Sequence, residues 1–239
     1  MKLTDFKVLT FDCYGTLIDW EKGLTAAFGP WRKRAGVKAG DEELLAAFAQ
    51  VESPVQTENP TLRYPDVLAE SLKRLSATMG APATPEECKA FGAAIGDWPA
   101  FPDTPGAMRA LKQHYRLVIL SNVDRASFAK SKLRLGAEMD AIYTAEDIGS
   151  YKPSLSNFEY LIRHVNQDFG LEKNQILHVA QSLFHDHVPA KKFGLATCWI
   201  DRRGAKGGSG ATAAITEDVT PDWTFPTLQG LADAQNAAK

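Results

Sequence analysis

The chain has 239 residues, with 27 Lys and Arg against 29 Asp and Glu. This length suffices for one large α/β domain, or for a core domain that carries a smaller insert. Near-zero net charge without a basic run argues against a nucleic-acid or membrane partner and favours a small-molecule substrate. We see no signal-peptide pattern, no apolar stretch of ~20 residues and no Cys-x-x-Cys pairing, so we expect a cytoplasmic protein.

The first predicted element is a buried strand over residues 6–11, where apolar residues dominate. It places Asp12 at its carboxyl end, which is where ligands bind in an α/β sheet. Gly15 and Thr16 would let the chain turn tightly beneath a bound anion. Asp12 is therefore a candidate nucleophile; the alternative is that it only caps a turn, as aspartates often do.

Four amphipathic stretches follow, over residues 23–35, 41–51, 64–79 and 85–95, and we predict a helix for each. Consecutive helices without intervening strands indicate a helical insert. Residues 98–103 contain two prolines, each of which pushes its predecessor out of the helical region, so we predict an extended return to the first domain there.

From residue 104 the pattern alternates between helices and short apolar strands, with strands expected over residues 117–120, 141–143, 175–179 and 196–200. Such alternation predicts an α/β fold with a parallel sheet. Residues 222–225 are expected to add a short edge strand before a last helix. Residues 204–210 are rich in glycine and predict a flexible loop.

Polar residues follow several of these strands. Ser121 and Asn122 come after the second core strand, Lys152 precedes a proline between two core elements, and Asp186 lies beyond the strand that ends at residue 179. A lysine beside a buried carboxylate would keep it ionised, which a nucleophile requires. The alternative is that Ser121 and Asn122 are ordinary turn residues and that Lys152 is a solvated surface lysine.

Taken in order, the motifs Asp12-Cys13-Tyr14-Gly15-Thr16, Leu120-Ser121-Asn122, Lys152-Pro153 and residues 178–186 resemble those of the haloacid dehalogenase superfamily. The resemblance implies a Rossmann-like core with a parallel sheet flanked by helices, and a small helical cap inserted after the first strand. It divides the chain into a core of residues 1–18 and 98–239 and a cap of residues 19–97.

Two departures narrow the implied chemistry. Tyr14 stands where phosphatases of the superfamily carry a second aspartate, and Ala180-Gln181 replaces their Gly-Asp. Asp12 with Asp186 alone makes a poor magnesium site, so we expect no metal and no cofactor. His185 and His187 flank Asp186 but would point apart on a helix, and we expect them to serve packing or the surface.

Within the superfamily the chain resembles the 2-haloacid dehalogenase branch, in which an aspartate displaces a leaving group from C2 of a small carboxylic acid and water hydrolyses the resulting ester. Residues 47–52 lack the halide-binding arginine that this branch offers. Together with residues 12–20, 52–58 and 182–187, this resembles the azetidine-2-carboxylate hydrolases. We therefore favour ring opening of L-azetidine-2-carboxylate over dehalogenation of (S)-2-haloacids, with Glu52 and Gln56 suited to an ammonium.

The resemblance assigns roles to individual residues. Asp12 is the nucleophile, Lys152 keeps it charged, and Asp186 positions or activates the water. Thr16, Ser121 and Asn122 bind the substrate carboxylate or orient Asp12. The other expected substrate-binding residues are Tyr14, Trp20, Phe48, Tyr64, Gln181 and Ser182; for Trp20, Phe48 and Tyr64 the alternative is the cap's own core.

Two other functions stay open at this point: a magnesium-dependent small-molecule phosphatase, and a catalytically silent binding module. The resemblance also leaves a homodimer open.

Overall fold

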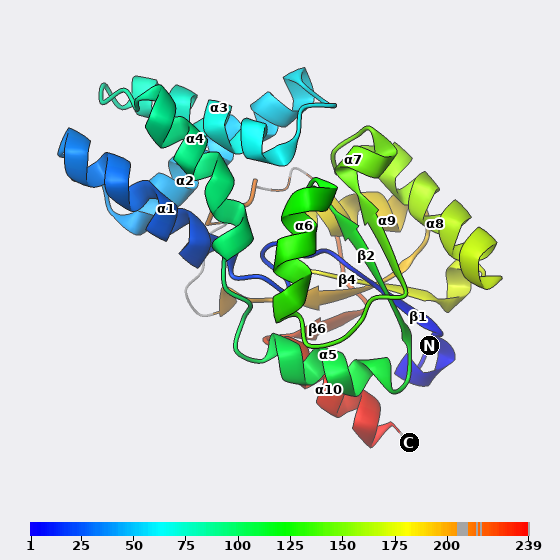
Figure 1. Cartoon of the computed structure of the whole chain (residues 1–239). Helices are drawn as coiled ribbons and strands as arrows, with labels where there is room; N and C mark the ends of the chain where they lie inside the picture. The colour runs from blue at the N-terminus through cyan, green and yellow to red at the C-terminus, as the bar shows by residue number, and fades with distance from the viewer. Residues whose placement is uncertain (205–209, 214, 216, 239) are drawn as a thin grey trace.

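The computed structural model describes residues 1–204, 210–213, 215 and 217–238. Six strands form one parallel sheet in the order β3-β2-β1-β4-β5-β6 (Figure 1). Their bounds are β1 (Val8–Phe11), β2 (Arg116–Ser121), β3 (Ala141–Thr144), β4 (Ile176–Ala180), β5 (Ala196–Ile200) and β6 (Trp223–Phe225). The predicted α/β fold with a parallel sheet is confirmed, and β6 is the expected edge strand.

Strand β1 lies at the centre of the sheet, between β2 and β4, with Phe11 opposite both Ile119 and Val179. All four residues of β1 are buried, as expected for a parallel strand covered on both faces. Because neighbouring strands run in the same direction, the carboxyl ends of β1, β2 and β4 meet at one edge of the sheet. The polar residues that follow these strands are thereby brought together.

Helices cover both faces of the sheet. On one face, α5 (Thr104–Lys112), α6 (Arg125–Ser131) and α10 (Leu228–Ala237) share a core with Leu9 and Phe11. On the other face, α8 (Leu155–Phe169) and α9 (Val188–Lys192) pack with Val8 and Val118. The short helix α7 (Ala145–Ile148) follows β3. Alternate residues of β1 thus face opposite helical layers.

Between β1 and α5 the chain forms a helical segment that stands beyond one edge of the sheet (Figure 1). It consists of α1 (Trp20–Ala35), α2 (Asp41–Glu58), α3 (Tyr64–Thr78), α4 (Pro85–Ala93) and the 3-10 turn η2 (Ala94–Asp97). Its interior is aromatic: the ring of Phe28 lies 4.9 Å from that of Phe91 and 6.2 Å from that of Phe48, between ring centroids. The division of the chain at residues 19 and 97 into two domains stays a prediction.

Helix α2 is longer than predicted. The predicted helix ends at residue 51, but the observed helix continues through Pro54 to Glu58. A proline inside a helix removes one backbone hydrogen bond without preventing the chain from continuing. The two added turns carry Glu52 and Gln56, which lie four residues apart and therefore share one face of the helix.

Two arginines after β5 connect the core to the turn at residue 16 and to the helical segment. The guanidinium of Arg202 donates to the backbone carbonyl of Thr16 at 2.8 Å, and Arg203 forms ion pairs with Glu21 of α1 and Glu42 of α2, each at 2.5 Å. The predicted glycine-rich loop begins beside these residues, but positions 205–209 lie outside the described residues.

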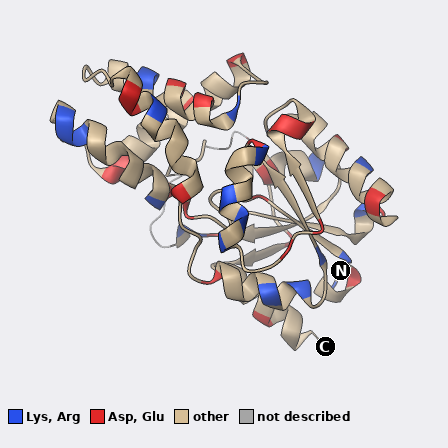
Figure 2. Cartoon of the chain, viewed as in Figure 1, with Lys and Arg blue, Asp and Glu red and all other residues tan. Residues whose placement is uncertain are grey.

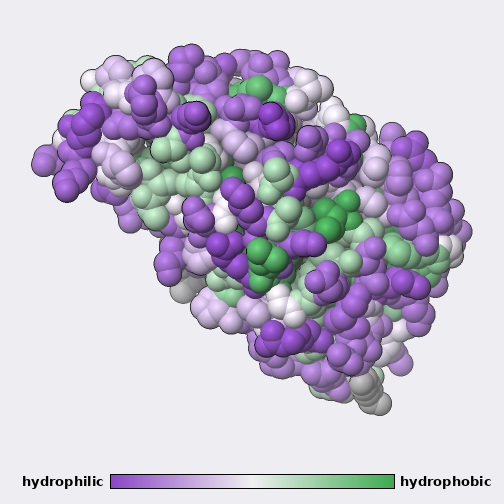
Figure 3. All heavy atoms as spheres, viewed as in Figure 1, coloured by the Kyte–Doolittle hydropathy of each residue, from purple (hydrophilic) through white to green (hydrophobic). Residues whose placement is uncertain are grey.

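Positively and negatively charged residues are spread along the helices (Figure 2). Hydrophilic side chains cover most of the face shown in Figure 3, with smaller apolar areas between them. Among the described residues, none of the helices combines the length and the apolar character needed to cross a bilayer.

Candidate active site

Asp12 follows β1 directly, and its backbone N–H donates to the carbonyl of Val179 on β4 at 3.1 Å. Gly15 then adopts φ +96°, a conformation that L-residues with a side chain rarely adopt. The turn brings Thr16 back beneath the carboxylate, where its hydroxyl donates to Asp12 Oδ2 at 2.7 Å and accepts from the N–H of Gln181 at 2.9 Å. The predicted tight turn therefore orients the candidate nucleophile.

Lys152 is buried, with 1% of its surface exposed, and its ammonium has three partners. Nζ donates to Asp12 Oδ1 at 2.9 Å, to Asp186 Oδ1 at 2.6 Å and to the carbonyl of Leu120 at 3.0 Å. Asn122 fixes its backbone, since the Lys152 N–H donates to Asn122 Oδ1 at 2.7 Å and Asn122 Nδ2 donates to the Lys152 carbonyl at 2.9 Å. The amide of Asn122 thus positions Lys152.

Asp186 is completely buried and is held from two sides. Besides Lys152, its Oδ1 contacts His178 Nε2 at 3.0 Å, and His178 Nδ1 in turn contacts the hydroxyl of Thr10 at 2.9 Å. Oδ2 of Asp186 has no hydrogen-bond partner among the described residues. The sequence analysis did not predict a role for His178. The one sequence feature that could have indicated it is a titratable residue in the middle of an otherwise apolar strand.

The three charged groups alter one another's protonation. Burial raises the pKa of Asp12, the ammonium of Lys152 opposes this rise, and the neighbouring carboxylate of Asp186 adds to it. Burial would also raise the pKa of Asp186, but Lys152 and His178 together hold it well below its ordinary value. Burial lowers the pKa of Lys152, yet Asp12 and Asp186 outweigh this and raise it. Lys152 is therefore a permanent cation beside Asp12.

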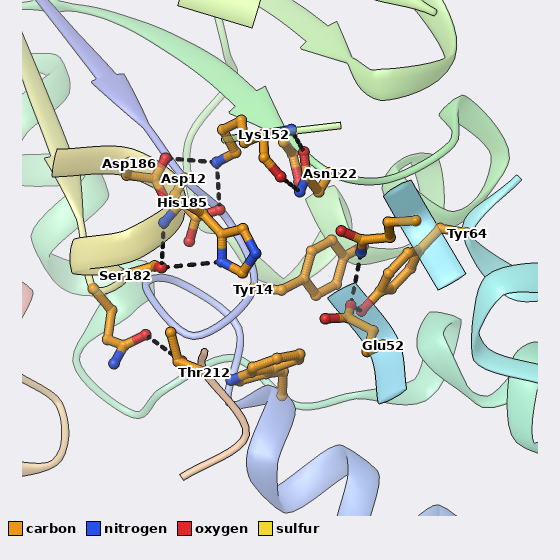
Figure 4. Close-up of a pocket in the computed structure, with 14 residues that line it drawn as sticks. Asp12, Tyr14, Glu52, Tyr64, Asn122, Lys152, Ser182, His185, Asp186 and Thr212 are labelled. Carbon is orange, nitrogen blue, oxygen red and sulfur yellow. Dashed lines mark hydrogen bonds and ion pairs between the residues drawn. The ribbon is translucent and has the colours of Figure 1, made fainter. Parts of the chain in front are cut away.

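A cavity opens beside these groups, between the sheet edge and the helical segment (Figure 4). It is lined by Asp12, Tyr14, Trp20, Glu52, Gln56, Tyr64, Ser121, Asn122, Lys152, Gln181, Ser182, His185, Asp186 and Thr212. A buried carboxylate, a cation and unpaired polar atoms at the ends of parallel strands form an arrangement suited to nucleophilic catalysis.

Comparison with known proteins agrees with this geometry. Residues 6–182 match the family model described as a haloacid dehalogenase-like hydrolase. The chain belongs to this family.

Two curated relatives are similar to part of this chain in sequence. The chain is 29% identical over 138 residues to an (S)-2-haloacid dehalogenase of Pseudomonas sp. (strain YL), covering 56% of this chain and 53% of the relative. It is 31% identical over 135 residues to haloacetate dehalogenase H-2 of Moraxella sp. (strain B), covering 55% of this chain and 54% of that relative. The matches span about half the length of these relatives.

The structure of L-2-haloacid dehalogenase from Xanthobacter autotrophicus with chloropropionic acid covalently bound superposes with a TM-score of 0.77 at 19% identity. The match covers 97% of this chain and 98% of that one. At this identity the likeness concerns the fold, which extends over nearly the whole chain.

The structure of this dehalogenase-like hydrolase places most of the predicted site residues around one cavity. All but Thr16 and Phe48 line it. Thr16 lies beneath Asp12 as described. Phe48 takes the alternative position left open by the sequence, in the core of the helical segment: its side chain is fully buried among Trp20, Phe28 and Phe91.

Sequence reasoning left three lining residues without an adequate role. Thr212 donates to Gln181 Oε1 at 3.2 Å and had no sequence signal. Glu52 and Gln56 were named only as suited to an ammonium, although both line the cavity from α2. Glu52 Oε1 accepts from Tyr64 at 2.9 Å and from Gln56 at 2.8 Å. Burial raises the pKa of Glu52 to about 7.

His185 lines the cavity as well, so its predicted place in packing or at the surface is wrong. It lies in a π-helical turn, Leu183–His187, where its N–H donates to the hydroxyl of Ser182 at 2.9 Å. His187 is buried and contacts the carbonyl of Ala180 through Nε2 at 3.0 Å, as expected for a packing role. π-Turns occur frequently at functional sites, and here the turn sends His185 and Asp186 to one cavity.

The donors around the cavity do not fit a magnesium ion. Among the described residues there is no group of three or more His, Cys, Asp or Glu side chains arranged to hold a metal. Asp12 and Asp186 share the ammonium of Lys152, and the side-chain oxygen of Gln181, at the place of the family's first metal-binding acid, accepts a hydrogen bond from Thr212. Magnesium requires several oxygen ligands in octahedral geometry, which these donors do not supply.

Proposed function

We propose that the protein is a hydrolase that displaces a leaving group from C2 of a small 2-substituted carboxylic acid through an ester of Asp12. The observation that carries this proposal is the bridging of Asp12 and Asp186 by the buried ammonium of Lys152, with all three residues lining one cavity. The two curated relatives bear the names of haloacid dehalogenases, which supports the same reaction class.

In the first step a carboxylate oxygen of Asp12 attacks C2, and the leaving group departs with the electron pair of its bond. Lys152 and Thr16 hold the carboxylate so that its attacking lone pair faces the cavity. Ser121 Oγ is buried without a partner among the described residues and is free to donate to the substrate carboxylate. Water then attacks the Asp12 ester carbonyl, guided by the unpaired Oδ2 of Asp186, and releases a 2-hydroxy acid.

The leaving group we favour is a ring amine rather than a halide. Among the described residues that line the cavity, Lys152 is the single lysine or arginine, whereas three residues carry a carboxyl group: Asp12, Asp186 and Glu52. An anionic haloacid would add negative charge to this site, whereas a zwitterionic amino acid adds no net charge. The ammonium of L-azetidine-2-carboxylate would face Glu52 and Gln56, and a protonated amine needs no acid at position 14 in order to leave.

Turnover of three substrates tests this proposal: L-azetidine-2-carboxylate, (S)-2-chloropropionate and an aryl phosphate, each with a chelator and with added magnesium. We expect ring opening in the chelator, with slower chloride release. Chloride release alone would retain the aspartyl-ester mechanism and overturn the choice of leaving group. Phosphate release that requires magnesium, without activity on the other two compounds, would contradict the proposal as a whole.

The Glu52→Gln variant tests the proposed ammonium site. Ionised Glu52 binds the ammonium, so kcat/KM for L-azetidine-2-carboxylate should rise as the pH increases through about 7. The Glu52→Gln variant should lack this pH-dependent rise. Its kcat/KM should also be about 10- to 100-fold lower, which corresponds to the free energy of a hydrogen bond to a charged group. Chloride release from (S)-2-chloropropionate should not fall. Glu58→Gln is the control, because Glu58 lies on the same helix and pairs with Arg74 at the surface; an equal loss there would contradict the assignment.

A further inference from the structure

We propose that His185 is the general base that takes the proton from the water that hydrolyses the Asp12 ester. This inference rests on the proposed function, because it concerns the second half of that reaction. It assigns a catalytic residue that neither the sequence motifs nor the comparison with relatives singled out.

The position of His185 suits this role. Its backbone N–H donates to Ser182 Oγ, and Nδ1 lies 3.1 Å from the same oxygen, so both the backbone and one ring nitrogen are fixed. Nε2 is buried and has no hydrogen-bond partner among the described residues. Figure 4 shows the imidazole extending from the side of Ser182 into the cavity that Asp12 and Tyr14 also line. A water between Nε2 and the Asp12 ester would have a ready acceptor.

Asp186 is less suited to accept the proton. Its Oδ1 already accepts from Lys152 at 2.6 Å and contacts His178 at 3.0 Å. These partners hold the pKa of Asp186 well below its ordinary value, so its carboxylate binds a proton weakly. Burial lowers the pKa of His185 to about 4, which leaves its imidazole neutral near neutral pH, with a ring nitrogen that can accept a proton. Asp186 thus orients the water, and His185 receives its proton.

The step balances as follows. The tautomer that donates from Nδ1 to Ser182 leaves a lone pair on Nε2. Water oxygen forms a bond to Cγ of Asp12 while one water proton moves to Nε2. The tetrahedral intermediate then breaks the bond to the ester oxygen, and the departing 2-oxyanion takes the proton from Nε2. His185 returns to its neutral form and a 2-hydroxy acid is released. Asp12 is left as the carboxylic acid and loses the second water proton to solvent, which restores its carboxylate.

Quenched-flow mass spectrometry of the intact full-length protein tests this inference. With the substrate that the wild type turns over, His185→Ala should form the ester on Asp12 and hydrolyse it about 10²- to 10⁴-fold more slowly, so that a covalent adduct accumulates. Added imidazole should speed its hydrolysis. His185→Gln, which retains a polar side chain of similar reach, should also accumulate the adduct. His164→Ala is the control, since His164 packs on Tyr160 of α8.

Several results would overturn the inference. Hydrolysis of the ester at the wild-type rate in both His185 variants would show that another group takes the proton. Loss of ester formation itself would place His185 in the first step. If the wild type formed neither ester nor product with any of the three test substrates, the proposed function itself would be contradicted. This outcome differs from failure of the His185 inference alone, in which the wild type is active.

Discussion

Asp12→Asn should abolish turnover of every substrate of the protein, by about 10⁴-fold or more, because an amide cannot form the ester on which both half-reactions depend. The fold should survive, since the asparagine oxygen can still accept from Lys152 and the Thr16 hydroxyl can turn to accept from the amide NH2, so that both contacts of Asp12 keep a partner. Single-turnover reaction of the wild type in 18O-labelled water should place the label in Asp12, as water attacks the aspartyl carbonyl.

The control for this variant is Asp168→Asn. Asp168 lies on α8, where its carboxylate accepts a hydrogen bond from the hydroxyl of Tyr143 at 2.7 Å. It should retain full activity. Label found only in the 2-hydroxy acid after a single turnover would mean that water attacks C2 directly. Asp12 would then orient the substrate without forming a covalent bond to it.

Lys152→Met should reduce stability more than any other single change at the site, by about 3–5 kcal/mol, because it leaves two buried carboxylates without their shared cation. Without the ammonium, the folded-state pKa values of Asp12 and Asp186 rise above their unfolded values. The stability deficit should therefore be largest at alkaline pH and shrink as the pH falls and both carboxyls become protonated. Denaturant unfolding at several pH values measures this directly.

The same variant should lose activity near neutral pH and recover part of it as the pH rises, since Asp12 must be ionised to attack. Lys33→Met on the exposed side of α1 is the matched control and should change neither property. A deficit in stability that does not vary with pH would indicate lost packing around the lysine stem instead of unpaired charge.

Much of the fold was predictable because parallel strands are buried on both faces and read as short apolar runs. Strand β5 has the predicted bounds, and the others differ at their ends by one or two residues. The largest error was the early end predicted for α2, at residue 51. Helix α2 instead continues past it, and Val55 and Gln56 in the added turns are buried. Packing outweighed a local preference.

The candidate site was predictable where residues lie at the ends of strands, because parallel topology alone brings Asp12, Ser121 and Gln181 to one edge. Side chains whose position depends on local helix geometry were not predictable in this way. His185 reaches the cavity through a π-turn, which spacing rules for α-helices do not describe. Phe48 and Tyr64 look alike in sequence, but only the contact with Glu52 draws the ring of Tyr64 to the cavity.

The insertion of α1–α4 between β1 and α5 gives the cavity two separately encoded walls. Asp12, Lys152 and Asp186 come from the sheet edge, whereas Glu52, Gln56 and Tyr64 come from the inserted helices. Under the proposed function, the groups that make bonds and the groups that distinguish one leaving group from another therefore lie on separate segments of the chain. A graft of the inserted helices from a halide-releasing relative onto this sheet would transfer substrate preference while the attacking carboxylate stayed in place.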